Sequence, residues 1–243
     1  MKKIVYIVLF SFQLVFSQGQ SGTLTYYLEY NPEYLESFNK GIEKNKQYAG
    51  VTTQMRNLTL ELNKQVYYNL SFCGSESYFK RSTFFIQESG MKNRFKRVLL
   101  ETRNRGVYVV KGTGQDIYWL ENAFDKDYVV RLASPKWEIH DTKTVLLGYT
   151  CYKATTKRLS TTGKGYDTIT AWFSPALNLP IAPNGFIGLP GAVLKLDIKN
   201  YSLVAHEISF SDCDLPNVKI PKKTWTMEAF AKEVSEINLR LRH

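Results

Sequence analysis

One short segment combines an imidazole with carboxylates, the groups that acid–base catalysis uses most often. His140 lies between Glu138 and Asp141, and such side chains exchange protons near neutral pH. Alternate residues of an extended strand point to the same face, so Glu138 and His140 would share a face from which Asp141 points away. No further residue of the segment completes a catalytic site. We therefore expect no catalytic residues, and an enzyme whose site is assembled from distant segments is kept as an alternative.

The cysteines offer a second kind of chemistry, thiol exchange or metal binding. Cys73, Cys151 and Cys213 are widely spaced and form no CxxC motif, which favours neither activity. The sequence also contains no signature of a serine hydrolase elbow, a zinc protease, a nucleotide-binding loop or a calcium loop. We therefore predict no metal site and no cofactor. In an oxidising compartment one disulfide can form, and three pairings are open.

The most distinctive stretch, residues 180–192, reads PIAPNGFIGLPGA. Pro190 presets φ and Gly191 accepts a positive φ, a pair that predicts a type II turn before a strand that begins near Ala192. A structural corner explains these residues, and the functional alternative is a loop that shapes the mouth of a pocket. On that alternative, the candidate binding residues are Trp172, Phe186, Gly188, Leu189, Pro190 and Gly191.

These residues also resemble the signature of the GLPGLI family of exported proteins from Bacteroidota. The similarity rests on Gly188-Leu189-Pro190-Gly191, preceded by Ala171-Trp172-Phe173, and extends over roughly residues 137–235. Two features depart from the family: Ala192-Val193 replaces its Leu-Ile, and residues 31–54 look longer than its simplest form. The family has no assigned activity or catalytic residues. The resemblance therefore implies a compartment and a β-rich architecture but no mechanism.

Alternation of apolar and polar residues predicts the strands that position these side chains. In residues 192–200, leucine and isoleucine alternate with charged residues, so one face of this strand would be exposed to solvent. A sheet with one buried and one solvent-exposed face is typically antiparallel. In residues 202–210 the same alternation places His206 beside Val204 and Ile208 on a buried face. The other predicted strands cover residues 23–30, 55–63, 66–72, 83–87, 97–102, 106–111, 117–121, 128–132, 138–140, 144–156 and 168–173.

Two segments do not alternate. Residues 33–47 are charged and poorly periodic, which indicates a loop or a marginal helix. Near the C-terminus, apolar residues recur every three or four positions after Thr226, which predicts a capped helix of about sixteen residues docked on the sheet. Its apolar stripe consists of Met227, Phe230, Val234, Ile237 and Leu241. The predicted fold class is mainly β: a single curved antiparallel sheet or half-barrel with a docked C-terminal α-helix.

The N-terminus has the pattern of a secretory signal. Lys2 and Lys3 precede an apolar run over residues 4–16, which is shorter than the roughly 20 residues that span a bilayer. We predict a signal peptide at residues 1–17 and one β-rich domain at 18–243. The expected location is the periplasm or the extracellular space, in soluble form after cleavage.

Charge narrows the expected partners. The 243 residues include 32 Lys or Arg and 22 Asp or Glu, a net charge of +10. Without Lys2 and Lys3 of the signal peptide, 30 basic and 22 acidic residues leave a charge of +8. In an exported protein, this charge favours peripheral contact with an anionic envelope surface and argues against nucleic acid. Part of the excess lies between residues 92 and 105, either as a guarded sheet edge or as a binding patch. That part consists of Lys92, Arg94, Lys96, Arg97, Arg103 and Arg105.

The function that these observations predict is a non-catalytic binding or carrier module for an apolar ligand in the cell envelope. The first alternative is a protein-partner module of an outer-membrane assembly, which would use the basic segment or an exposed sheet edge. The second alternative is the enzyme considered above.

Overall fold

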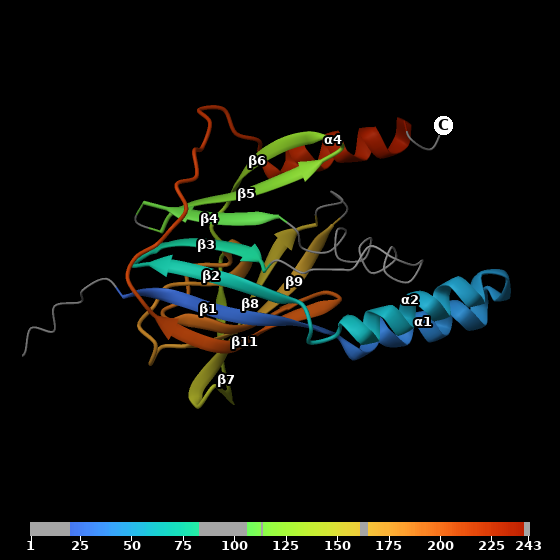
Figure 1. Cartoon of the computed structure of the whole chain (residues 1–243), viewed down its shortest axis with the longest axis horizontal. Helices are drawn as coiled ribbons and strands as arrows, with labels where there is room; N and C mark the ends of the chain where they lie inside the picture. The colour runs from blue at the N-terminus through green and yellow to red at the C-terminus, as the bar shows by residue number, and fades with distance from the viewer. Residues whose placement is uncertain (1–19, 83–105, 113, 161–164, 241–243) are drawn as a thin grey trace, which may run out of the picture.

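The computed structural model describes residues 20–82, 106–112, 114–160 and 165–240 (Figure 1). Several predictions from the sequence lie outside these residues: the signal peptide at 1–17, the strands at 83–87 and 97–102, and the basic residues between 92 and 105. No helix in the described part of the chain is both long enough and apolar enough to cross a membrane.

Eleven strands of the described residues form one antiparallel sheet, in the order β6-β5-β4-β3-β2-β1-β11-β10-β9-β8-β7. The strands are β1 (Ser21–Tyr30), β2 (Tyr67–Cys73), β3 (Glu76–Arg81), β4 (Val107–Lys111), β5 (Asp116–Ala123), β6 (Lys126–Leu132), β7 (Glu138–Leu146), β8 (Tyr149–Leu159), β9 (Tyr166–Ser174), β10 (Ala192–Ile198) and β11 (Tyr201–Phe210). The sheet is curved, and its end strands β6 and β7 do not pair, so it is not a closed barrel. This architecture confirms the predicted fold class.

The core lies on the concave face of the sheet. Alternate residues of β1 are buried, from Gly22 to Tyr30, as the alternation predicts. The loop 175–191 folds over this face and contains a short 3₁₀ helix, η2 (Pro183–Gly185). It contacts β3, β4 and β5 so closely that a Cβ on Gly185 would lie 2.6 Å from Ile117 Cγ2. The chain therefore fills much of its own concave face.

The predicted strand at residues 55–63 is wrong, because this segment is helical. Helix α1 (Pro32–Lys44) and helix α2 (Ala49–Leu62), joined by the 3₁₀ turn η1 (Lys46–Tyr48), form a hairpin that projects from the sheet (Figure 1). Leu58 and Leu62 are buried while Leu60 is 40% exposed. This is the four-residue spacing of a helix face, which a pattern of alternate leucines also contains.

The predicted strand at residues 144–156 is also wrong, since the chain turns back within it. Strands β7 and β8 form a hairpin through Leu147 and Gly148, whose φ angles are 49° and 79°. Two successive positive φ angles are those of a type I′ turn, which suits the twist of a two-residue hairpin. The predicted strand at 138–140 forms the first part of the longer strand β7.

His206 is exposed, so the prediction of a buried histidine is wrong. The register of β1 and β11 pairs Thr25 with Glu207 and Tyr26 with Ala205, which leaves His206 without a partner. Such a bulge inserts one residue and reverses the alternation beyond it. The imidazole lies 5.6 Å from the Tyr67 ring, measured between centroids.

The C-terminal helix is confirmed as α4 (Met227–Arg240). Thr226 Oγ1 accepts a hydrogen bond from the Ala229 backbone N–H at 3.2 Å, which is the predicted cap. Met227 and Phe230 are buried, and the Phe230 ring lies 4.9 Å from the Trp119 ring of β5 between centroids. Leu241 lies outside the described residues.

One of the three open disulfide pairings is present. Cys73, at the end of β2, is bonded to Cys213 beyond the end of β11, and their Cα atoms are 5.4 Å apart. Cys151 is a buried free thiol of β8.

Candidate functional site

The glycine-proline segment forms a corner, but not by the predicted type II turn. The Gly191 N–H donates to the Leu189 carbonyl oxygen at 2.9 Å, so the turn contains three residues and is centred on Pro190. Gly191 has a φ of 149°, and a Cβ there would overlap the Ser174 carbonyl oxygen. Leu189 is buried, whereas Gly188 and Pro190 are exposed. The turn at Pro190 and the close approach of Gly191 to the Ser174 backbone give residues 188–191 a structural role.

Trp172 and Phe186 are not brought together. Ala171 and Phe173 are buried in the core, so Trp172 between them points to the opposite face of β9, where its neighbours across the strands are Lys153 and Lys195. Phe186 is buried beneath the sheet's concave side. The structure therefore does not form a pocket mouth from this pair.

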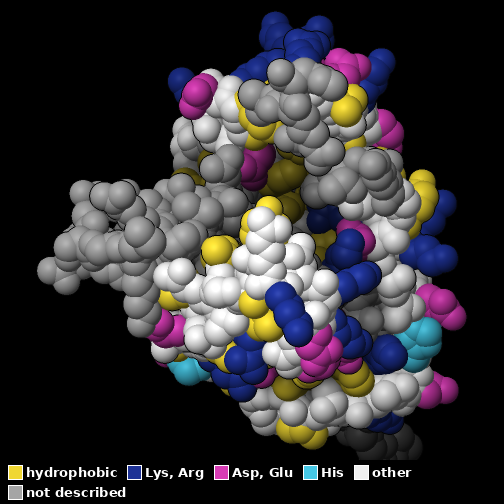
Figure 2. Space-filling model, turned by 90° about the vertical axis from the view of Figure 1, so that its right-hand side faces the viewer, with side chains coloured by type: hydrophobic (Ala, Val, Ile, Leu, Met, Phe, Trp, Pro, Cys, Tyr) yellow, Lys and Arg dark blue, Asp and Glu magenta, His cyan; other side chains and the backbone are white. Residues whose placement is uncertain are grey.

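A cleft of about 710 Å³ opens where the loop, strand β8 and the start of α4 meet. Leu132, Phe186 and Met227 supply apolar wall, and Thr156 and Arg158 supply polar groups. Figure 2 shows a hollow in the upper half of the molecule, with hydrophobic side chains in its depth and Lys or Arg side chains beside it. Of the predicted binding residues, Phe186 alone lines this cleft.

The connection between β6 and β7, residues 133–137, forms one wall of the cleft. Thr156 Oγ1 donates to the Lys136 carbonyl oxygen at 2.8 Å, and Trp137 Nε1 donates to the Ile187 carbonyl oxygen at 2.9 Å. These two bonds join the connection to β8 and to the loop 175–191. These bonds hold residues 133–137 in place between β8 and the loop 175–191.

Arg158 is the partly buried cation of the cleft. Its guanidinium carbon lies 4.5 Å from the centre of the Phe186 ring and 5.8 Å from that of Tyr108, which are cation–π distances. Its Nη1 donates to the Asn184 carbonyl oxygen at 3.3 Å. Burial lowers the pKa of Arg158 from its usual value, while the neighbouring tyrosines oppose that shift. The guanidinium remains charged at neutral pH.

Burial also shifts the pKa values of two tyrosines near Arg158. Burial raises the pKa of Tyr108, and it raises the pKa of Tyr201 well above its usual value. Both phenols are therefore neutral at physiological pH and do not neutralise the Arg158 charge. Proximity to Arg158 acts against both shifts but is a smaller effect than burial.

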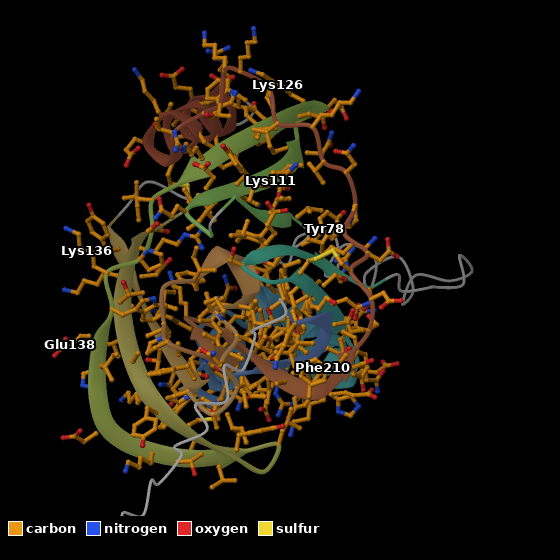
Figure 3. All side chains as sticks on the ribbon, turned by 90° about the vertical axis from the view of Figure 1, so that its left-hand side faces the viewer. Tyr78, Lys111, Lys126, Lys136, Glu138 and Phe210 are labelled. Carbon is orange, nitrogen blue, oxygen red and sulfur yellow. A yellow bond between two sulfur atoms is a disulfide. The ribbon has the colours of Figure 1, made fainter. Side chains whose placement is uncertain are left out.

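The segment with the imidazole and carboxylates lies at the rim of the cleft. Glu138 and Lys136 are exposed there, at the outer edge of the molecule (Figure 3). His140 Nε2 lies 2.8 Å from Thr155 Oγ1, and Asp141 is exposed. Among the described residues, no group of three His, Cys, Asp or Glu side chains could hold a metal ion.

Sequence reasoning missed Arg158. The predicted strand ended at Thr156, yet the same alternation continues to residue 158: Ala154 and Thr156 are buried, and Arg158 is the next residue on that face. A charged residue that continues a buried alternation is the signal that could have identified it.

No protein-family model matches the chain, and no curated protein matches it. Two solved structures of PNGF-II, in space groups C2 and P21, resemble it with TM-scores of 0.44 and 0.45 and 11% and 12% sequence identity. Each likeness covers 89% of this chain, and 32% and 33% of the respective PNGF-II chains. This chain thus spans about a third of the length of those proteins, and a likeness at this level says nothing of its activity.

Proposed function

We propose that the chain is an exported, non-catalytic binding module that holds a small, largely apolar ligand in the cleft beside Phe186. The observation that carries the proposal is the cleft itself. Its volume of about 710 Å³ lies within the range of roughly 300–1,000 Å³ typical of small-molecule sites. Leu132, Phe186 and Met227 provide an apolar wall for such a ligand, and the threonines and charged side chains that line the rest of the cleft provide polar groups.

The position of the cleft refines the expected binding mode. A carrier with an empty curved sheet would hold its ligand against the middle of the concave face, but here the loop 175–191 occupies that position. The ligand would instead lie beside the loop, between β8 and the start of α4. The glycine-proline corner then acts on binding indirectly, by holding Phe186 in place.

Two features support export. The N-terminal signal pattern is one, and the bond between Cys73 and Cys213 is the other, because structural disulfides persist mainly in oxidising compartments. The basic charge supports peripheral contact with an anionic envelope surface.

Uptake of the fluorescent apolar probe N-phenyl-1-naphthylamine tests the proposal. The purified chain is expected to bind the probe, and Met227→Glu is expected to weaken binding about tenfold by placing a carboxylate in the apolar wall. Leu239→Glu is the matched control, because Leu239 is 57% exposed on the same helix. Thermal denaturation confirms that each variant is folded. An unmodified chain that leaves the probe free, or a folded Met227→Glu variant with unchanged uptake, would overturn the proposal.

A second candidate function, strand addition by an envelope protein, is favoured by the two ends of the sheet. The edge strand β6 is covered by Trp225, whose N–H donates to the Val129 carbonyl oxygen at 2.8 Å. Strand β7 has one described neighbour, β8, and exposes Ile139 and Val145. A photo-crosslinker at position 145 that captures no envelope protein in cells would remove this candidate.

A further inference from the structure

The described residues hold the Arg158 guanidinium in a defined orientation but accept few hydrogen bonds from it. A guanidinium has five N–H donors, and the described residues offer Arg158 one hydrogen bond, to the Asn184 carbonyl oxygen. The Phe186 ring lies 4.5 Å from its central carbon and covers part of the group. The side chain therefore lines the cleft with N–H donors that bond to none of the described residues.

No carboxylate in the described part of the chain lies within ion-pair distance of Arg158. Asp167, its partner across β8 and β9, pairs instead with Lys199 at 3.7 Å. A partly buried charge without a counter-ion is costly, and burial is the largest influence on this guanidinium. Cation–π contact with Phe186 and Tyr108 offsets a part of that cost but leaves the positive charge unneutralised. An anion bound in the cleft would neutralise the Arg158 charge and accept hydrogen bonds from its guanidinium.

The other charged residues of the cleft are exposed. These are Lys136, Lys157, Glu138 and Glu228, and water screens the charges of all four. Arg158 alone combines partial burial with contact to the apolar wall at Phe186. A single guanidinium balances one negative charge, and its planar donor pair matches a carboxylate in bidentate geometry. A phosphate monoester would add nearly a second negative charge to a cleft that already holds two carboxylates at its rim.

We propose that the ligand of the cleft is an amphiphile with a carboxylate on an apolar body, and that Arg158 binds the carboxylate while Leu132, Phe186 and Met227 contact the apolar part. This inference rests on the proposed function of the cleft and extends it to a ligand class. It applies equally to a free fatty acid and to a larger apolar carboxylic acid.

Calorimetric titration with dodecanoate and with dodecanol tests this inference, since the two probes share a chain and differ in charge. The unmodified chain is expected to bind dodecanoate about tenfold or more tightly than dodecanol, the size of effect typical of a charge-assisted hydrogen bond. Arg158→Met is expected to reduce that preference to about one while it still binds dodecanol. Lys153→Gln is the matched control: it removes one positive charge from the opposite face of β8 and should keep the preference.

The outcomes separate the two proposals. Equal binding of both probes by the unmodified chain overturns the assignment of a carboxylate ligand but leaves the apolar cleft in place. Binding of neither probe overturns the proposed function together with this inference. If Arg158→Met does not fold, Arg158→Lys serves in its place; it keeps the charge, loses the planar donor pair, and should lower the preference several-fold. A preference that persists in the folded Arg158 variant excludes Arg158 as the carboxylate partner.

Discussion

Gly191 shows how one residue fixes the corner that holds the loop 175–191. Its φ of 149° is a conformation that other residues rarely adopt, and a side chain there would overlap the Ser174 carbonyl oxygen of the adjacent strand. Gly148, in the β7–β8 hairpin, also has a positive φ, but nothing lies within 4 Å of an added Cβ. A substitution at Gly148 would therefore introduce backbone strain alone, whereas one at Gly191 would introduce strain and steric overlap.

We predict that Gly191→Ala destabilises the protein by about 3 kcal/mol or more, because strain and overlap add, whereas Gly148→Ala costs about 1 kcal/mol from strain alone. Urea denaturation of the two variants and the unmodified chain measures both values. Equal losses at the two positions would contradict the role of the overlap with Ser174.

Residue types revealed the corner but not the charged cleft. Pro190 and Gly191 identify a turn from their own backbone preferences, although the turn type depends on how β9 and β10 meet. Arg158 has no such preference. Alternation along β8 could have placed Arg158 on the buried face, but its contacts with Phe186, Asn184 and Tyr108 come from other segments of the chain, and no local pattern encodes those contacts.

Helix α2 shows how an element can be misread from the same residues that define it. Leu58, Leu60 and Leu62 alternate like a strand, but Leu58 and Leu62 also have the spacing of one helical face. In the structure these two are buried and Leu60 is on the other side. Periodicity over so short a segment satisfies both geometries, and packing against the neighbouring element decides between them.

The helical assignment of this segment predicts unequal effects of substitutions at Leu60 and Leu62. Leu62→Ala should destabilise the protein by about 2–5 kcal/mol because Leu62 is buried, while Leu60→Ala should change stability by less than about 0.5 kcal/mol. A strand would bury the two leucines alike. Comparable losses in chemical denaturation would therefore contradict the helical assignment of this segment.

At the scale of the whole molecule, the sheet is assembled from both ends of the described chain. Strand β3 was not predicted from the sequence, so the β2–β3 hairpin was missed. The β10–β11 hairpin, by contrast, follows from alternation in two predicted strands and the turn between them. The central pairing of β1 with β11 does not, since it joins Gly22 to Phe210 across almost the entire chain. The mainly β class was thus predictable, whereas the strand order required contacts between segments that are remote in sequence.

The disulfide reinforces this remote pairing. Cys73 and Cys213 are 140 residues apart. Cys73 ends β2 and Cys213 follows β11, the two strands that flank β1, so the bond ties β2 to the segment after β11. A bridge that closes so long a segment removes much conformational entropy from the unfolded chain.

We predict that Cys73→Ser with Cys213→Ser lowers the free energy of unfolding by about 2–5 kcal/mol. A reductant should lower the denaturation midpoint of the unmodified chain toward that of the double variant and leave the double variant unchanged. Cys151→Ala is the control: it removes the remaining thiol, which forms no bridge, so its midpoint should stay sensitive to reductant. If reduction left the unmodified chain as stable as before, the β1–β11 pairing and the concave core would account for the stability without the bond.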